Sequence, residues 1–306
     1  MPSLLTRGMF LSFGVWIFLF GNPGLAKSAS LFGSVQVESF SSDAGNCQEG
    51  GNDSSSSSTV MVSASCQTPG SHASASAVGT ARADFGSLGV QLLTSSSTSA
   101  THPGSVETSD SFGSAFAQSF DTLTVSNAST SGFLRINFSV FGNLTVVTQG
   151  DKVPGVVIGE SFTGIGVAVN NNVVWSNSLG SVNGSTFFGT LSPVIPFSFG
   201  NTPLNVFFSS TGRCAASRAG DGTGFSCQTN ASFIGSAVVT GLEVLDLNQN
   251  LIPNAIVNSE SGFNYQAGFP HTPTIPEPST ILLWGTGLAG LIGWRVKNPN
   301  MCRKRG

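Results

Sequence analysis

Charged residues are scarce in this chain. Only 9% of the 306 residues are charged, against about 25% in an ordinary soluble protein. Between positions 28 and 276 there are five basic and 14 acidic residues, which gives a net charge of −9. Proteins bind nucleic acids mainly through lysine and arginine contacts to phosphates. A body this acidic therefore excludes nucleic acid as a partner.

Catalytic motifs are missing as well. The chain has neither a G-x-S-x-G nucleophile elbow nor an H-E-x-x-H metalloprotease sequence. Its three histidines, His72, His102 and His271, lie in segments rich in serine, glycine, threonine or proline. The acidic residues are scattered, and nothing marks two of them as a glycosidase pair. We therefore predict that the protein is not an enzyme, and the sequence indicates no cofactor.

One stretch imitates a calcium-binding loop. Asp246-x-Asn248-x-Asn250 supplies the first three ligand positions of an EF-hand. The sixth position, however, is Leu251 instead of glycine, and the twelfth is Val257 instead of glutamate. Asn and Asp side chains bond to their own backbone in tight turns, so we interpret this stretch as a turn.

The apolar run at the N-terminus is too short to span a membrane. Arg7 precedes a largely apolar run of twelve residues at positions 9–20, whereas about 30 Å of hydrocarbon needs about 20 residues. The helix-breaking residues 21–24 follow, and Ala26 ends a Gly-Leu-Ala sequence suited to cleavage. We predict a signal peptide over residues 1–26. A buried core helix and an uncleaved anchor are the alternatives.

The body is rich in serine, threonine, glycine and asparagine, and its apolar content comes largely from phenylalanine and valine. This mixture favours strands over helices. Residues 134–140 alternate between apolar and polar, which is the pattern of a half-buried strand. Similar runs lie at 35–37, 60–62, 120–125, 155–158, 165–169, 187–188 and 206–208. We predict an antiparallel β-sandwich over residues 27–264, with the phenylalanines in its core.

Loops and turns are predicted from composition. Residues 242–247 and 252–257 flank Asn248-Gln249-Asn250, which predicts a hairpin. Residues 52–59 contain a run of five serines, and residues 93–101 are nearly all serine or threonine. We expect both patches to be flexible loops.

The five cysteines divide between the body and the C-terminal tail. Cys47, Cys66, Cys214 and Cys227 fall in the body, and Cys302 falls in the tail. Four cysteines allow three connectivities. We expect Cys47–Cys66 and Cys214–Cys227, the nearest-neighbour pairs, which leave no free thiol in an oxidising compartment. A metal site is not favoured, because no C-x-x-C pair or nearby histidine completes a ligand set.

The C-terminus combines a proline motif, an apolar run and basic residues. Pro276-Glu277-Pro278 keeps the chain extended and accessible, because the two prolines have no backbone donor. An apolar run follows at residues 281–294, and residues 280–294 would form about 22 Å of helix, which is short for a complete span. Arg295 and Lys297 follow, and the positive-inside rule places them on the cytoplasmic side.

This order of features resembles the PEP-CTERM sorting domain of Gram-negative bacteria. Pro276, Glu277 and Pro278 match its proline motif, and residues 285–291 match its glycine- and leucine-rich helix. The chain departs from the pattern in running eleven residues past Arg295. The resemblance implies an exosortase partner in the inner membrane, which removes the helix and passes the protein to the cell surface or extracellular matrix.

We therefore expect an exported protein that is anchored in the inner membrane until it is processed. Its parts are the signal peptide (1–26), the sandwich (27–264), a linker (265–278) and a C-terminal transmembrane helix with a basic tail (279–306). The leading function is structural or adhesive, at the cell surface or in the exopolysaccharide matrix of a biofilm. A carbohydrate-binding module is the alternative, but it would use a groove lined by aromatic side chains, and the body has only one tryptophan, Trp175, and one tyrosine, Tyr265. A secreted hydrolase is the third class.

Overall fold

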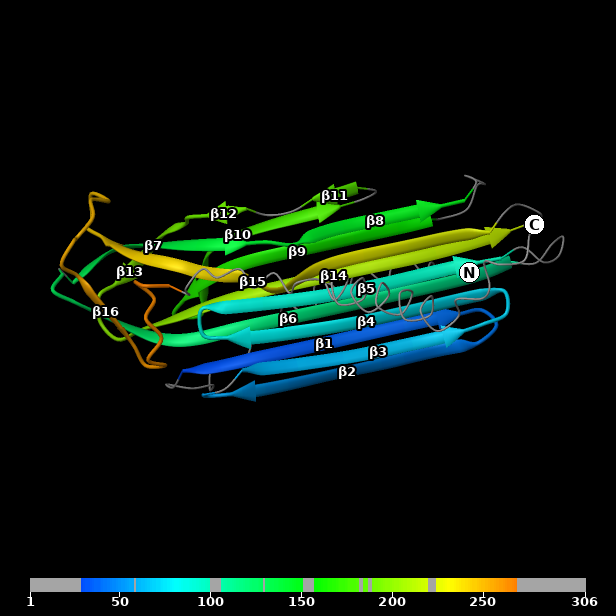
Figure 1. Ribbon diagram of the computed structural model, residues 1–306, viewed down its shortest axis with the longest axis horizontal. Coiled ribbons are helices and arrows are strands. Elements are labelled where there is room, and N and C mark those ends of the chain that lie inside the picture. Colours follow the sequence, from blue (N-terminus) through cyan, green and yellow to red (C-terminus); the bar gives the residue numbers. More distant parts are fainter. Residues whose placement is uncertain are drawn as a thin grey trace, which may run out of the picture. The chain divides into compact units, whose positions relative to one another are not determined.

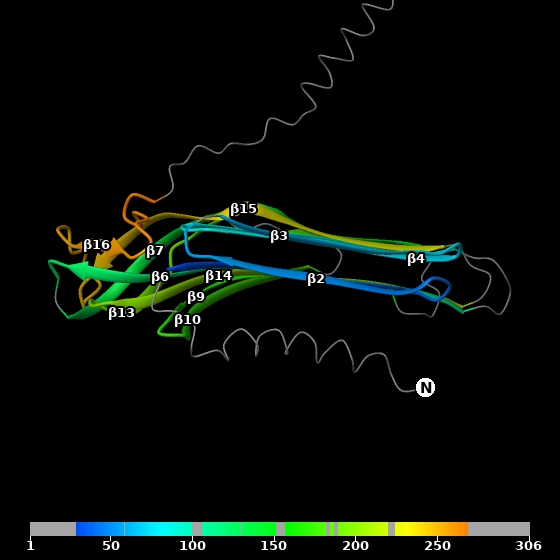
Figure 2. The same cartoon turned by 90° about the horizontal axis from the view of Figure 1, so that it is seen from below.

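The computed structural model describes residues 29–57, 59–99, 106–128, 130–150, 157–181, 184–186, 189–219 and 224–268. None of the residues in these ranges is helical. They form two antiparallel sheets that stack face to face as two layers (Figures 1 and 2). The predicted antiparallel β-sandwich is confirmed. The expected signal helix and the expected C-terminal transmembrane helix lie outside the described residues.

Sheet A has the strand order β10-β9-β14-β6-β1-β2, and β16 pairs with the end of β6. The long strand β6 lies near its middle and pairs with β1 on one side and β14 on the other. The bounds of the strands in this sheet are β1 (Ser30–Ser41), β2 (Gly45–Ser55), β6 (Val106–Ser126), β9 (Val157–Val169), β10 (Asn172–Ser181), β14 (Thr202–Ala219) and β16 (Ile256–Ser259).

Sheet B has the order β11-β8-β15-β5-β4-β3. Strand β7 pairs with the second half of β15 and is itself paired with β12 and β13. The bounds of the strands in this sheet are β3 (Val60–Pro69), β4 (Ala73–Asp84), β5 (Ser87–Thr98), β7 (Ser131–Val140), β8 (Asn143–Gln149), β11 (Gly184–Thr186), β12 (Thr190–Leu191), β13 (Val194–Ser198) and β15 (Phe225–Leu245).

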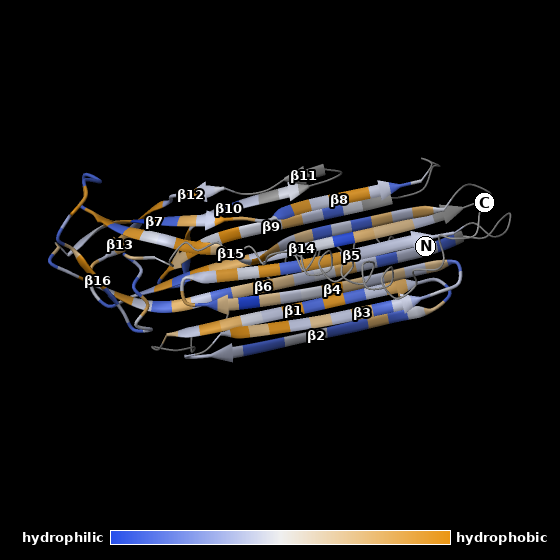
Figure 3. Ribbon diagram, viewed as in Figure 1, coloured by the Kyte–Doolittle hydropathy of each residue, from blue (hydrophilic) through white to orange (hydrophobic). Residues whose placement is uncertain are grey.

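Alternation of side chains along each strand positions the core between the two sheets, and apolar and polar residues alternate along many strands in Figure 3. The predicted run at 134–140 lies in β7, where Leu134, Ile136 and Phe138 are at most 1% exposed. The other predicted runs at 35–37, 60–62, 120–125, 165–169 and 206–208 also lie in strands. The run at 155–158 is only partly described, and the run at 187–188 lies outside the described residues.

Short turns join neighbouring strands in the same sheet. Asn170 and Asn171 connect β9 to β10, and both have positive φ angles, of 51° and 63°. Asparagine tolerates this conformation, and two such residues in succession form the type I′ turn that matches the twist of a hairpin.

The interior changes character along the strands. One end of the sandwich holds β7, β13 and β16 (Figure 1, left). Large apolar side chains such as Leu123, Ile136 and Phe138 fill the interior there. At the other end, which we call the hydroxyl end, small polar side chains take their place. The buried side chains there are Ser39, Ser41, Thr68, Thr94, Ser96, Thr98, Ser109, Ser111 and Thr229, each at most 4% exposed.

Two serine-rich patches that were expected to be flexible loops are largely strand. Residues 52–55 belong to β2, and residues 93–98 belong to β5. In β5 the hydroxyls of Thr94 and Ser96 face the interior and are hydrogen-bonded there. The composition wrongly indicated loops, because a serine or threonine hydroxyl can form its hydrogen bonds with other side chains inside a sandwich as well as with water.

The expected hairpin around residues 248–250 forms only in part. Asp246 N donates to Asn250 O (2.8 Å), and Ile252 N donates to Val244 O (2.9 Å). Pro253 then interrupts the pairing because it has no backbone donor. The next strand, β16, pairs with β6 in sheet A instead of with β15.

Several phenylalanines lie outside the core, contrary to the expectation. Phe40 and Phe162 are 42% and 48% exposed. Phe116 lies on the outer face of sheet A, where its ring centroid is 6.2 Å from that of Phe32 and 6.3 Å from that of Phe207. The inward positions of the neighbouring segment of β6 are taken by serine, glycine and alanine, so the alternation places the large rings on the outer side.

The folded body extends beyond the expected boundary at residue 264. Tyr265 is 1% exposed and belongs to the core, and Gln266 Nε2 donates to Ala255 O (2.9 Å). The expected linker start at residue 265 is therefore too early, since described structure continues through residue 268.

Candidate functional site

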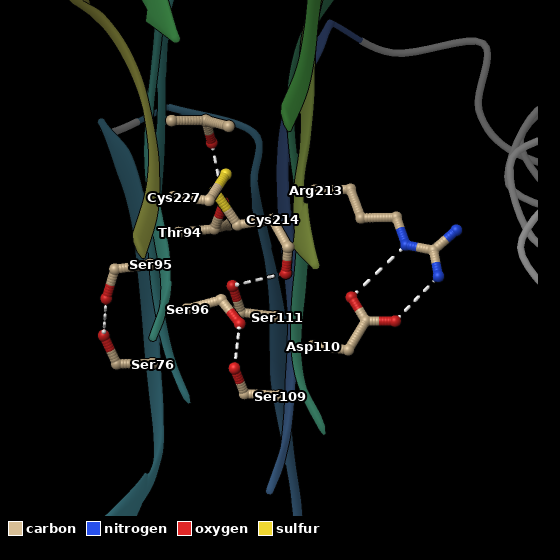
Figure 4. The surroundings of a disulfide bond; sticks show 11 residues. Ser76, Thr94, Ser95, Ser96, Ser109, Asp110, Ser111, Arg213, Cys214 and Cys227 are labelled. Carbon is tan, nitrogen blue, oxygen red and sulfur yellow. Dashed lines mark hydrogen bonds and ion pairs between the residues drawn. A yellow bond between two sulfur atoms is a disulfide. The ribbon is translucent and has the colours of Figure 1, made fainter. Parts of the chain in front are cut away.

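Both disulfides join sheet A to sheet B. Cys47 on β2 is bonded to Cys66 on β3, with a Cα–Cα distance of 5.8 Å. Cys214 on β14 is bonded to Cys227 on β15, with a Cα–Cα distance of 5.5 Å (Figure 4). These are the nearest-neighbour pairs expected from the sequence. Each bond therefore crosses the interior and fixes the spacing of the two layers.

Hydrogen bonds between buried hydroxyls surround the Cys214–Cys227 bond. Ser96 on β5 and Ser109 on β6 share a hydrogen bond of 2.6 Å between their Oγ atoms, which links the two sheets (Figure 4). Ser111 Oγ donates to the carbonyl oxygen of Cys214 (3.4 Å). Satisfied hydroxyls avoid the cost of burial but contribute less than apolar contacts do. At the hydroxyl end, covalent and hydrogen bonds between the sheets thus supplement a weak apolar core.

The turns at the hydroxyl end are tied together by one carboxylate. Asp43, in the turn after β1, accepts a hydrogen bond from Ser41 Oγ (2.6 Å). It also accepts bonds from Ser71 Oγ (3.1 Å) and the backbone N of His72 (2.9 Å), in the turn after β3. The Ser41 bond, followed by the His72 backbone bond, lowers the pKa of Asp43 well below its ordinary value. This carboxylate therefore joins a turn of sheet A to a turn of sheet B.

His72 thus lies in a structural turn, whereas His102 and His271 lie outside the described residues. In the ranges that the structure describes, no three histidine, cysteine, aspartate or glutamate residues gather closely enough to hold a metal ion.

The segment that imitates an EF-hand is a turn. Asp246 Oδ1 accepts hydrogen bonds from the backbone N of Asn248 and of Asn250, both at 2.8 Å. The bond from the Asn250 backbone is the main cause that lowers the pKa of Asp246. The Asp246 carboxylate thus closes the turn through its backbone hydrogen bonds, as the turn interpretation predicted.

One buried acidic group was missed in the sequence. Asp121 is fully buried, accepts a hydrogen bond from Ser261 N (3.1 Å), and also accepts one from Ser261 Oγ. These bonds attach the C-terminal segment of the body to β6. The signal was present in the alternation, which puts Asp121 on the same inward side as Leu123 and Val125.

The two aromatic residues considered for carbohydrate binding are used in packing. The Trp175 ring stacks on Phe138, with centroids 6.1 Å apart and planes 8° from parallel. Tyr265 meets Phe263 edge to face, with centroids 4.7 Å apart. Burial raises the pKa of the Tyr265 phenol, and the nearby charge of Asp121 raises it further. Tyr265 is therefore closed to a sugar, and Phe138 covers one face of the half-buried Trp175.

The outer face of sheet B carries a broad array of uncharged polar side chains, which we call the polar face. Its hydroxyl and amide residues are Ser63, Ser65, Gln67, Ser74, Ser76, Thr80, Gln91, Ser95, Ser97, Asn143, Thr145, Gln149, Ser226, Gln228, Asn230 and Ser232. With Pro69, Val78, Leu93 and Val147 they complete four cross-strand rows over β8, β15, β5, β4 and β3. No charged residue occurs in these four rows.

Two depressions open near the hydroxyl end of the polar face. One, of about 290 Å³, is lined by Ser95, Val147, Gln149 and Gln228 among others. The second, of about 300 Å³, is lined by residues of the turn at 70–74 and of the facing strand ends. Chemically, these surfaces can exchange hydrogen bonds with a neutral polar ligand.

The sorting residues lie outside the described residues, and this holds for Pro276, Glu277, Pro278, Arg295 and Lys297. Among the described residues, no helix has the length and apolar character needed to cross a membrane. The family model of the PEP-CTERM protein-sorting motif matches residues 274–297 of the chain. The expected sorting signal is thereby confirmed, and it is consistent with an exosortase substrate. No curated protein matches the chain.

Proposed function

We propose that this chain is a structural or adhesive protein of the cell surface or extracellular matrix, placed there by an exosortase. The observation that carries the proposal is the PEP-CTERM sorting motif at residues 274–297. A motif of this kind directs an exported, membrane-anchored precursor to processing. The signal peptide expected at residues 1–26 would begin the same route.

The body supports a structural role because its cysteines and several of its carboxylates are engaged in holding the fold. All four body cysteines are in disulfides between the sheets, which suits an oxidising compartment outside the cytoplasm. Asp43 and Asp246 accept backbone hydrogen bonds in turns, and Asp110 forms an ion pair of 2.7 Å with Arg213 on the outer face of sheet A (Figure 4). What the described body offers to a partner is broad sheet surface.

Sorting is tested by replacing Pro276, Glu277 and Pro278 together with alanine in the bacterium that makes the protein. The triple variant should be exported but retained at full length in the inner membrane, because the exosortase no longer recognises the segment. The control replaces His271, Thr272 and Pro273 with alanine, just before the matched residues, and should be processed normally. If the first variant is processed and reaches the surface as the wild type does, the sorting proposal is wrong.

The structural or adhesive role is tested in the same strains. Deleting the gene should weaken attachment of the cells to a surface or the cohesion of their matrix. The wild-type protein should restore both properties, and the triple-alanine variant should restore neither because it stays in the inner membrane. Full restoration by the trapped variant, or no defect on deletion, would contradict this role.

Binding of a neutral polysaccharide is a second candidate function, and the polar face favours it. Its hydroxyls and amides provide donors and acceptors without charge, and the depression beside Gln228 can receive part of a sugar chain. Affinity electrophoresis of the surface protein in gels that contain neutral polysaccharide tests this function. Binding that is lost in Gln228→Ala and kept in Gln48→Ala, a change at an exposed glutamine of sheet A, would support it. Equal migration with and without polysaccharide would exclude it.

A further inference from the structure

Both sheets end on the same side of the sandwich in a long, regular strand. Strand β2 is the edge of sheet A, and β3 is the edge of sheet B (Figure 1, lower edge). The Cys47–Cys66 bond holds these two edges beside each other. In the part of the chain that the structure describes, no further strand pairs with the outer side of residues 45–54 or 60–69. The sandwich therefore presents a double edge, which we define as these two segments.

The double edge lacks most of the features that prevent edge-to-edge pairing, and its exceptions are Glu49 and Asp53, two charged residues on the inner side of β2. Lysine, proline, bulges and very short edge strands normally block the addition of another strand. The double edge contains no lysine or arginine, and its one proline is Pro69, at the very end of β3. The pairings of β2 with β1 and of β3 with β4 run without a register shift. Its backbone thus offers ten residues for pairing in each layer, and the register of the contact decides how many of them are used.

The opposite side of the sandwich is protected, and this contrast makes the open edge informative. There, β10 contains an irregularity between Val173 and Trp175. In sheet B, the corresponding border is divided among β11, β12 and β13, which have three, two and five residues. Short and irregular edges of this kind resist strand addition.

We propose that the double edge is the contact surface for a second copy of this chain. A twofold axis perpendicular to both layers would pair β2 with the partner copy's β2 and β3 with its β3, both antiparallel. One rotation thus satisfies both sheets and continues the two layers across the contact. The contact is isologous, as in most symmetric dimers. The inference goes beyond sorting and does not depend on it.

The acidic residues of β2 select the register of this contact. Residues directly opposite in an antiparallel pair share a face, and like charges there are destabilising. If Gly51 lay opposite Gly51 of the partner copy, Glu49 of each copy would lie opposite Asp53 of the other. If Gly50 lies opposite Gly50 of the partner copy, Glu49 lies opposite Gly51 of the other copy and Asp53 lies opposite Cys47. The second register avoids this direct repulsion and is centred on β2, so that residues 46–54 all pair with the partner copy; we therefore assign it to the dimer.

The same register predicts which residues of β3 meet at the axis. Strands β2 and β3 run in opposite directions (Figure 1), and the disulfide places Cys47 beside Cys66. Gly50 is three residues from Cys47, and Ser63 is three residues from Cys66 in the same direction along the edge. Ser63 should therefore lie close to Ser63 of the partner copy. Its side chain is exposed in the single chain.

Site-specific cross-linking in cells tests the contact with the full chain. Ser63→Cys is compared with Ser176→Cys, an exposed serine on β10 at the protected edge, both in a Cys302→Ser background. A short bismaleimide, which tolerates a shift of one or two residues, should give a covalent dimer with Ser63→Cys and none with Ser176→Cys. Dimers at both positions, at neither, or only at Ser176→Cys would overturn the proposal. Repeating the reaction in the triple-alanine variant separates this result from sorting.

A charge test covers the case in which the new cysteine disturbs the native disulfides. Ser63→Lys/Ser65→Lys brings lysines together across the contact, whereas Ser176→Lys/Ser178→Lys adds the same charges to β10. The dissociation constant of the dimer, measured by light scattering on the protein recovered from cells, should rise about tenfold or more for the β3 variant only. A monomeric wild type, or equal effects of the two variants, would refute the double edge as the contact.

Discussion

Replacing Leu92 tests how the two sheets interlock. Leu92 on β5 is fully buried and lies in a socket made by inward-facing glycines. A Cβ atom added at Gly113 on β6 would lie 2.4 Å from Leu92 Cδ1, and one added at Gly212 on β14 would lie 3.2 Å from Leu92 Cδ2. The absence of side chains at these two positions of sheet A thus makes room for a large one from sheet B.

The expected magnitudes follow from this socket. Leu92→Ala should lower the free energy of unfolding by about 3–5 kcal/mol, since it removes buried methyl groups and leaves a cavity. Gly113→Ala alone should cost about 1–3 kcal/mol, because its methyl group collides with Leu92. In the double variant the new methyl group occupies part of the cavity. The double variant should therefore lose about 1–2 kcal/mol less than the sum of the single changes.

Urea unfolding of the soluble body, followed by circular dichroism, measures all three variants. Leu93→Ala is the matched control, because Leu93 is the next residue on the same strand but points to the outer face. It should cost about 1 kcal/mol or less. If Leu93→Ala is as costly as Leu92→Ala, or if the changes at positions 92 and 113 are additive, the socket is wrong.

Two further predictions concern the hydroxyl end. Replacing Cys214 and Cys227 with serine removes the cross-link between two residues that are 13 positions apart in the sequence. The unfolded chain then gains conformational entropy, so the free energy of unfolding should fall by about 3 kcal/mol. A loss below about 1 kcal/mol in the same urea titration would show that the bond does not hold the layers together. The lowered pKa of Asp43 means that its ionised form stabilises the fold. This contribution is complete above about pH 4, the unfolded value, and is lost as the pH falls towards the lowered pKa. Asp43→Asn should therefore lose less stability on acidification than the wild type does, and equal losses would show that another group is responsible.

The strands could be predicted from the sequence because alternation is a local property. Residues 134–140 alternate strictly, and they form most of β7. Composition was a poorer guide, since the serines and threonines of residues 93–98 are typical of loops and yet form half of β5. Their hydroxyls find partners on strands far away in the sequence, such as Thr229 for Thr94. A window of the sequence does not contain that partner.

Asp121 is a second residue whose environment could not be predicted from its neighbours in the sequence alone. Alternation places Asp121 with Leu123 and Val125, but burial of an acidic residue is costly unless donors surround it. One of its donors is the backbone N of the neighbouring Thr122, but the other two come from Ser261, 140 residues later in the chain. The sequence contains both residues, but only the fold brings them together.

The sequence by itself determined the all-β architecture and the C-terminal sorting motif, because alternation and a linear motif are written in neighbouring residues. It also indicated the two disulfides through the order of the cysteines. Only the tertiary structure decided that Phe116 lies on an outer face, that Leu92 fits between glycines, and that β2 and β3 share one open side. An alternating strand has two possible inward faces, and the choice between them depends on which sheet packs against it.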